Sequence, residues 1–122
     1  MAGNAVWFEI PSVDFERAVK FYEQVFDTSL ERVNIGGDMA MFRGDPRQAL
    51  GAVLAPQADY VPSNTGATIY LNGGDDLAPV LARAAAAGGK VLVAKTALPP
   101  GMGYFAHFQD TEGNRVGLHS LN

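Results

Sequence analysis

The amino-acid sequence predicts an α+β protein in which the order β-α-β-β-β occurs twice. Residues 6–26 (VWFEIPSVDFERAVKFYEQVF) have the pattern of a strand, a capped turn and an amphipathic helix. Residues 67–87 (ATIYLNGGDDLAPVLARAAAA) have the same pattern roughly sixty residues later. A repeated supersecondary unit usually buries its apolar face against its copy. We therefore expect a functional site in the cleft that the two copies enclose.

The first copy begins with an aromatic and β-branched strand over residues 6–10. Alternation along this strand places Phe8 and Ile10 on one face, and Trp7 and Glu9 on the other. Asp14 is the expected N-cap of the following helix. The helix carries an apolar stripe that we expect to pack on the Phe8 face. Its members are Phe15, Ala18, Val19, Tyr22, Val25 and Phe26.

Three short strands are predicted next, over residues 30–35, 39–43 and 48–54, before a linker over residues 56–64. In the second copy we expect a strand over residues 68–72 and a helix capped by Asp75 or Asp76 that runs to residue 87. Its buried stripe is Leu77, Val80, Leu81 and Ala84. Further strands are expected over residues 90–94, 104–109 and 115–121, the last two joined by a turn at residues 110–114.

Length and composition limit the function classes. At 122 residues the chain fits one domain, built of module 1 (about residues 1–57) and module 2 (about residues 64–122). A net charge of −4 with scattered basic residues argues against nucleic acid as a partner. The chain has no cysteine, which excludes disulfides and thiolate chemistry. No signal-peptide pattern or long apolar run is visible, so we expect a cytoplasmic protein that does not bind membranes.

Three segments carry a resemblance to a known family. FEIPSVDFERAVKFY, YLNGGDDLAPVLARAAAAGGKV and FQDTEGNRVGLHS resemble the vicinal oxygen chelate (VOC) superfamily, which includes lactoylglutathione lyase, extradiol dioxygenases and bleomycin resistance proteins. The chain is most similar to the bacterial lactoylglutathione lyase-related branch. The resemblance implies a glyoxalase-like fold in which two βαβββ modules form one cup-shaped mixed sheet with the helices outside. It also implies a homodimer.

The resemblance further implies where a divalent metal ion would be held. The cleft-facing ligand positions of the family fall on Trp7, on Thr68 or Ile69, on Gly117, and within residues 51–54. An indole does not coordinate a metal ion, and glycine has no side chain with which to do so. We therefore expect no metal and no cofactor. A site built from His107, His119 and Glu9 is an alternative.

Candidate functional side chains remain after the metal ligands are set aside. His119 shares a strand face with Arg115 and Gly117, and it either acts as an acid or base near neutral pH or forms a local hydrogen bond. The same two interpretations apply to His107. Glu9 stands in an apolar strand, so it is either a general base with a raised pKa or a structural partner of the opposite module.

Aromatic residues provide a surface for a flat ligand. Trp7, Tyr70, Tyr104 and Phe105 would stack on such a ligand if they line the cleft, although Tyr70 and Phe105 also fit the core. The Gly/Pro-rich residues 98–103 form either a mobile lip of the cleft or an ordered connection.

Two classes of function follow. The first is a small-molecule-binding protein that holds an apolar or aromatic ligand without a metal. Its expected ligand-binding residues are Trp7, Glu9, Tyr70, Tyr104, His107 and His119. The second is a lactoylglutathione lyase-type or dioxygenase-related enzyme acting on a vicinal-oxygen substrate, with Glu9 and His119 as catalytic candidates. A purely structural or regulatory module is a third possibility.

Overall fold

The computed structural model describes residues 2–45 and 47–122, and it confirms the α+β fold class with the βαβββ order occurring twice. Met1 and Pro46, which belong to the predicted module 1, lie outside the described residues. Module 1 contains β1 (Trp7–Ile10), α1 (Phe15–Phe26), β2 (Glu31–Asn34), β3 (Asp38–Met41) and β4 (Leu50–Leu54). Module 2 contains β5 (Tyr70–Asn72), α2 (Leu77–Ala86), β6 (Lys90–Ala97), β7 (Tyr104–Gln109) and β8 (Arg115–Ser120).

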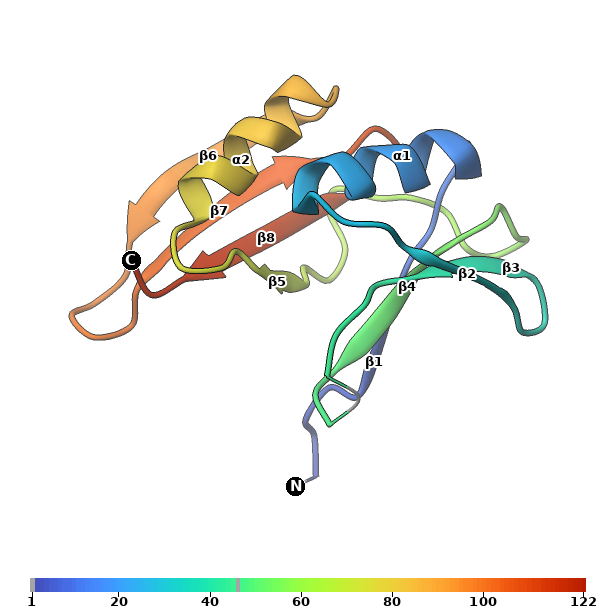
Figure 1. The fold of residues 1–122 in the computed structure, drawn as a ribbon, viewed down its shortest axis with the longest axis horizontal. Helices are drawn as coiled ribbons and strands as arrows, with labels where there is room; N and C mark the ends of the chain where they lie inside the picture. Colours follow the sequence, from blue (N-terminus) through green and yellow to red (C-terminus); the bar gives the residue numbers. More distant parts are fainter. Residues whose placement is uncertain (1, 46) are drawn as a thin grey trace.

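Within the described residues, the strands divide into two four-stranded mixed sheets, one for each module. The strand order is β1-β4-β3-β2 in the first sheet and β5-β8-β7-β6 in the second. In each sheet the edge strand that begins the module pairs in parallel with the last strand, and the other pairs are antiparallel. The two sheets diverge from each other, while α1 and α2 lie side by side and contact each other (Figure 1).

Helix α1 begins and ends as its sequence predicts. The side chain of Asp14 accepts a hydrogen bond from the backbone N–H of Arg17 at 3.1 Å, which confirms the N-cap. Asp27 closes the helix in the left-handed conformation, with φ of 50°. Phe21 is buried although it lies outside the predicted stripe, because α1 also packs against module 2, where Phe21 meets the ring of Phe108.

Helix α2 settles the choice between two acidic caps. Asp76, not Asp75, accepts a hydrogen bond from the backbone N–H of Ala78 at 2.9 Å. The predicted stripe of Leu77, Val80, Leu81 and Ala84 is buried. The helix ends at Ala86, one residue before the predicted end, and Gly88 then turns the chain with φ of +105°.

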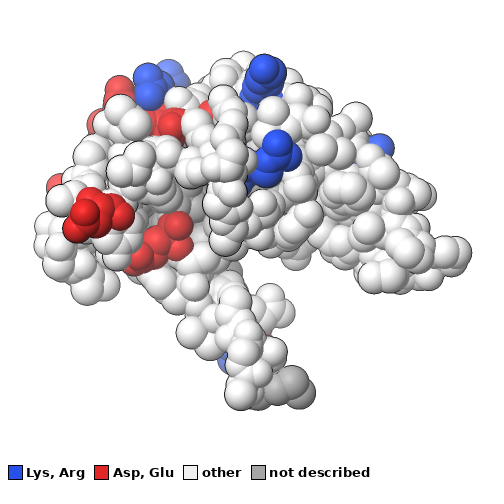
Figure 2. Space-filling model, turned by 180° about the vertical axis from the view of Figure 1, so that it is seen from behind, with Lys and Arg blue, Asp and Glu red and all other residues white. Residues whose placement is uncertain are grey.

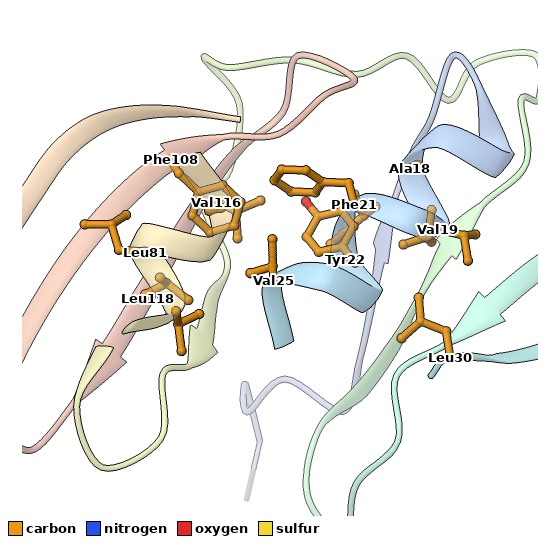
Figure 3. Close-up of a cluster of buried hydrophobic side chains, with 14 of the residues drawn as sticks. Ala18, Val19, Phe21, Tyr22, Val25, Leu30, Leu81, Phe108, Val116 and Leu118 are labelled. Atoms are coloured by element: carbon orange, nitrogen blue, oxygen red, sulfur yellow. The ribbon is translucent and has the colours of Figure 1, made fainter. Parts of the chain in front are cut away.

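One hydrophobic core joins the two modules. Side chains from α1 and the first sheet share a single buried cluster with side chains from α2 and the second sheet (Figure 3). Tyr22 of α1 lies at the centre, with its ring 5.5 Å from Phe42 of module 1 and 6.5 Å from Phe108 of module 2. The relative placement of the modules is therefore fixed by helix packing.

The turn between β7 and β8 connects the modules by hydrogen bonds. Its Glu112 side chain is fully buried and accepts from the backbone N–H groups of Val13 and Asp14 and from the guanidinium of Arg17. Asp110 accepts from the hydroxyl of Tyr22 at 2.6 Å. The turn predicted over residues 110–114 is confirmed, and these contacts show that it also orients the start of α1.

The environment of Glu112 changes its acidity. Burial raises the pKa of Glu112, but hydrogen bonds from Arg17, from Thr111 and from the two backbone N–H groups outweigh burial and lower the pKa to about 2. The carboxylate is therefore ionised at neutral pH and fully partnered.

In the described part of the chain, neither helix has the length and apolar character required to cross a membrane.

Candidate functional site

Each sheet has one face toward the shared core and one face away from it. On β1, Ile10 enters the core while Trp7 and Glu9 point to the opposite face, as alternation predicts. On β8, Leu118 enters the core and His119 takes the opposite face. Because the core-facing sides of both sheets meet in one cluster, the two opposite faces point away from each other.

This arrangement separates the predicted site residues into two groups. Trp7 and Glu9 form one group on the outer face of the first sheet, and Tyr70, His107 and His119 form another on the outer face of the second. No hydrogen bond or ring contact among the described residues joins the two groups. The expectation of one cleft enclosed by both modules of a single chain is therefore wrong for these residues, because helix packing turns their faces apart.

The first group is a tryptophan and a glutamate two residues apart. The Trp7 side chain is exposed, and its Nε1–H donates to a carboxylate oxygen of Glu9 at 3.2 Å. Glu9 is exposed on this outer face of the first sheet. Its partner is its own strand neighbour and does not come from the opposite module. Beside this pair, the same face carries a small apolar cluster built on Met39, Ala52 and Leu54.

In the second group, three polar side chains form a continuous hydrogen-bonded chain. Nη1 of Arg115 lies 2.9 Å from Nδ1 of His107, and Nε2 of His107 lies 2.6 Å from the hydroxyl of Tyr70. A guanidinium group can only donate, so Nδ1 of His107 accepts and its Nε2–H donates to the Tyr70 oxygen. Burial and the adjacent Arg115 lower the pKa of His107, which favours this neutral form.

A shallow pocket of about 290 Å³ lies beside this chain, lined by Tyr70, Leu98, Phe105 and His119. His119 donates from Nε2 to the backbone carbonyl of Met102 at 2.7 Å. That bond corresponds to the local interaction considered for His119, and it ties residues 98–103 to β8. Leu98 of the same segment lines the pocket.

Three aromatic residues differ in where the structure places them. Tyr70 is 51% exposed, so of the two interpretations open for it the structure excludes the core. Phe105 is half-buried on the same outer face, with its ring 5.7 Å from that of His107. Tyr104 points the other way along β7, where it packs against the core and lies 4.5 Å from Nζ of Lys95. Tyr104 is thus separated from the other predicted ligand-binding residues.

The positions that the resemblance assigns to metal ligands do not fit a metal ion. In β5 the outer residue opposite Gly117 is Tyr70, and not Thr68 or Ile69 as expected. In the first sheet, Trp7 lies opposite Leu50. The structure, over residues 2–45 and 47–122, brings together no three His, Asp or Glu side chains that could hold a metal ion. These positions hold the indole of Trp7, the phenol of Tyr70, the aliphatic side chain of Leu50, and Gly117, which has no side chain. Such a set of groups does not suit a divalent cation.

Alternation along β8 predicts that Arg115 shares the face of His119, but it does not predict a contact between Arg115 and His107. This contact depends on the β7–β8 register, in which Gln109 lies opposite Arg115 and His107 opposite Gly117. The turn over residues 110–114 sets that register. The amino-acid sequence predicts the turn, but it does not predict which residues of β7 and β8 lie opposite each other. A second pocket, of about 380 Å³, does lie between the modules and is lined in part by Phe8, Phe42 and Leu71. None of the predicted ligand-binding residues lines it.

Charge is spread thinly over the surface. On the face seen in Figure 2, lysine and arginine side chains stand separately and form no continuous basic patch. The ion pairs at the surface, such as Arg32 with Glu16 and Arg47 with Asp45, are local.

Comparison with known proteins identifies the family. The model of the Glyoxalase/Bleomycin resistance protein/Dioxygenase superfamily matches residues 5–118. A glyoxylase-like domain-containing protein of Didymella fabae is 34% identical over 117 residues, which cover 92% of this chain and 89% of the relative. The chain therefore belongs to the glyoxalase/bleomycin resistance protein/dioxygenase superfamily.

Solved structures agree on the fold. A glyoxalase-related enzyme from Fulvimarina pelagi has a TM-score of 0.71 at 17% identity, covering 97% of this chain and 88% of its own. A glyoxalase I mutant from Zea mays has a TM-score of 0.69 at 20% identity, with 94% of this chain covered. This chain spans only 46% of the maize protein, about half its length. TioX from Micromonospora sp. gives a TM-score of 0.62 at 20% identity, over 98% of this chain and 100% of its own.

Proposed function

We propose that this protein binds a small aromatic or apolar molecule, without a metal ion, in the pocket formed by Tyr70, Leu98, Phe105 and His119. The observation that carries the proposal is the composition of this pocket. Its walls are two aromatic rings, an imidazole and a leucine, a combination suited to stacking on a flat ligand. The hydrogen-bonded chain ends at the hydroxyl of Tyr70, so one of the residues that line the pocket also carries a polar group.

The proposed binding unit is a homodimer. The outer face of each module exposes an aromatic residue, Trp7 at 40% and Tyr70 at 51%. The edge strands β1 and β5 each lack a strand neighbour on one side within the described chain. A two-fold axis would place the outer face with Trp7 of each copy against the outer face with Tyr70 of the other copy. The dimer would therefore contain two equivalent contacts of this kind. Such a dimer would cover a pocket that is shallow and open in a single chain.

The enzymatic alternative of lactoylglutathione lyase or dioxygenase type draws less support from the site. Oxygen-chelating chemistry needs carboxylate or imidazole donors around an ion with open coordination positions. The corresponding positions hold Trp7, Tyr70 and Gly117. His119, one of the two catalytic candidates, already donates to a backbone carbonyl. Glu9, the other, is exposed and bonded to Trp7.

The test is a calorimetric titration of the purified protein with 1-methylnaphthalene, in the presence and absence of EDTA. We expect saturable binding that EDTA does not change and that Phe105→Ala weakens about tenfold. Val61→Ala, at an exposed apolar residue outside the pocket, is the control and should leave binding unchanged. Absence of saturable binding contradicts the proposal, and so does a stoichiometric metal ion whose removal abolishes binding.

A further inference from the structure

We infer that the Tyr70 hydroxyl recognises a negatively charged oxygen on the ligand, so that the ligand is an aromatic carboxylate or phenolate. Arg115 acts in this inference as a positioning residue, through His107. The inference rests on the proposed function, because it concerns the same pocket. It adds the chemical class of the ligand.

The first step is the direction of the hydrogen bonds. Arg115 donates to Nδ1 of His107, which leaves the ring proton on Nε2, and this proton is donated to the Tyr70 oxygen. With its oxygen occupied as an acceptor, the Tyr70 hydroxyl directs its own proton to another partner. That proton is a hydrogen-bond donor on a residue that lines the pocket.

The second step concerns charge. The ion pairs of the described residues involve Arg17, Arg32, Arg47 and Lys95, and they do not include Arg115. Apart from His107, the Arg115 side chain donates to the backbone carbonyl of Asn64 at 3.2 Å. Its positive charge is thus not matched by a carboxylate of its own. Because hydrogen bonds in series polarise one another, this charge strengthens the Tyr70 hydroxyl as a donor.

The third step joins this donor to the pocket. Tyr70 contributes both the ring that lines the pocket and the hydroxyl that ends the chain. The ring of His107 also packs edge-on against that of Tyr70, with centroids 5.2 Å apart, which holds the hydroxyl in place. A flat ligand stacked in the pocket can therefore present an oxygen to this hydroxyl. Charge-assisted hydrogen bonds are stronger than neutral ones, so an anionic oxygen is favoured.

The experiment compares two probes of the same ring system, 1-naphthoate and 1-methylnaphthalene, by calorimetry. We expect the wild type to bind naphthoate more tightly. Tyr70→Phe keeps the ring and removes the hydroxyl, so it should weaken naphthoate binding about tenfold and change methylnaphthalene binding less than twofold. Val61→Ala should change neither affinity.

The role of Arg115 needs a readout that a purely structural residue would not alter. In ¹⁵N NMR spectra we expect His107 of the wild type as the Nε2–H tautomer. Arg115→Gln should weaken naphthoate binding at least threefold, and it should also raise the His107 pKa, because a neighbouring positive charge is lost. If naphthoate binding weakens while the tautomer and pKa of His107 stay unchanged, the positioning role is wrong.

The remaining outcomes separate this inference from the proposed function. If the wild type binds neither probe, the proposed function fails, and the inference fails with it. If the wild type binds both probes equally and Tyr70→Phe changes neither affinity, the pocket binds apolar ligands as proposed. In that case only the inference about a charged oxygen is overturned.

Discussion

The ring of Tyr70 lies across Gly117, the residue directly opposite it in the parallel pair of β5 and β8. A Cβ atom at Gly117 would overlap with this ring. The first module repeats the arrangement with Phe8 across Gly51, but there the ring faces the core. On the outer face of module 2, Tyr70 can therefore reach His107 only because residue 117 has no side chain.

Gly117→Ala should therefore destabilise the protein by about 1–3 kcal/mol, because the methyl group displaces the Tyr70 ring. The free energy of unfolding, measured in urea, checks this. The same substitution in a Tyr70→Ala background should cost close to nothing, since the overlapping ring is gone. Gly66→Ala is the control, because its Cβ would meet no atom closer than 4.0 Å. Equal costs at positions 66 and 117 would contradict the explanation.

Much of the fold could be predicted because its signals are local. The caps Asp14 and Asp76 and the buried stripe of α2 follow from helical spacing and from carboxylates placed before each helix. Strand faces followed from alternation for Trp7 and His119. The burial of Phe21 was missed because it depends on contact with module 2, which no local pattern records.

The site was predicted less completely, because it depends on contacts between distant segments. The relative orientation of the modules is set by helix packing together with the hydrogen bonds of Glu112 and Asp110, which reach residues some ninety positions earlier. Nothing in the repeat shows that this contact turns the two outer faces apart. The chain from Arg115 to Tyr70 likewise requires the register of both β5 and β7 against β8.

Glu112 predicts how stability depends on pH. Its pKa is about 2 in the folded protein against an ordinary value of 4.5, a difference worth about 3 kcal/mol. Because the folded-state pKa is the lower one, this stabilisation is complete above about pH 4.5 and is lost as the pH falls toward 2. Urea unfolding between pH 2 and pH 7 should show this decline in the wild type.

Glu112→Gln is the matching variant. It should lower stability at pH 7 by about 3 kcal/mol and flatten the acid decline. Glu16→Gln, at an exposed glutamate paired with Arg32, is the control and should leave the free energy of unfolding nearly unchanged, because solvent screens this surface pair. A Glu112→Gln variant that keeps the wild-type acid decline would show that other carboxylates cause it.

Tyr22 links the core to the turn of module 2. Its hydroxyl donates to Asp110 at 2.6 Å in a fully buried position. Tyr22→Phe should lower the free energy of unfolding by about 1–2 kcal/mol, since Asp110 keeps its bonds from Asn114 and from the backbone N–H of Glu112. Tyr60→Phe, at a largely exposed ring, provides the control. If Tyr22→Phe leaves the free energy of unfolding unchanged, the remaining donors to Asp110 fully compensate for the lost hydroxyl.

Trp7 tests the proposed homodimer. It is the sole tryptophan of the chain and lies exposed on the outer face of module 1. In the dimer its indole would be covered by the second module of the other copy, so dilution should shift its emission to longer wavelength as copies separate. Trp7→Ala should raise the dimer dissociation constant about tenfold in sedimentation equilibrium, because aromatic residues dominate interface energies. Val61→Ala, at an exposed apolar residue between β4 and β5, is the control and should leave the dissociation constant unchanged. A wild type that sediments as a monomer at all concentrations would contradict the dimer, and the pocket beside Tyr70 would then have to bind its ligand uncovered.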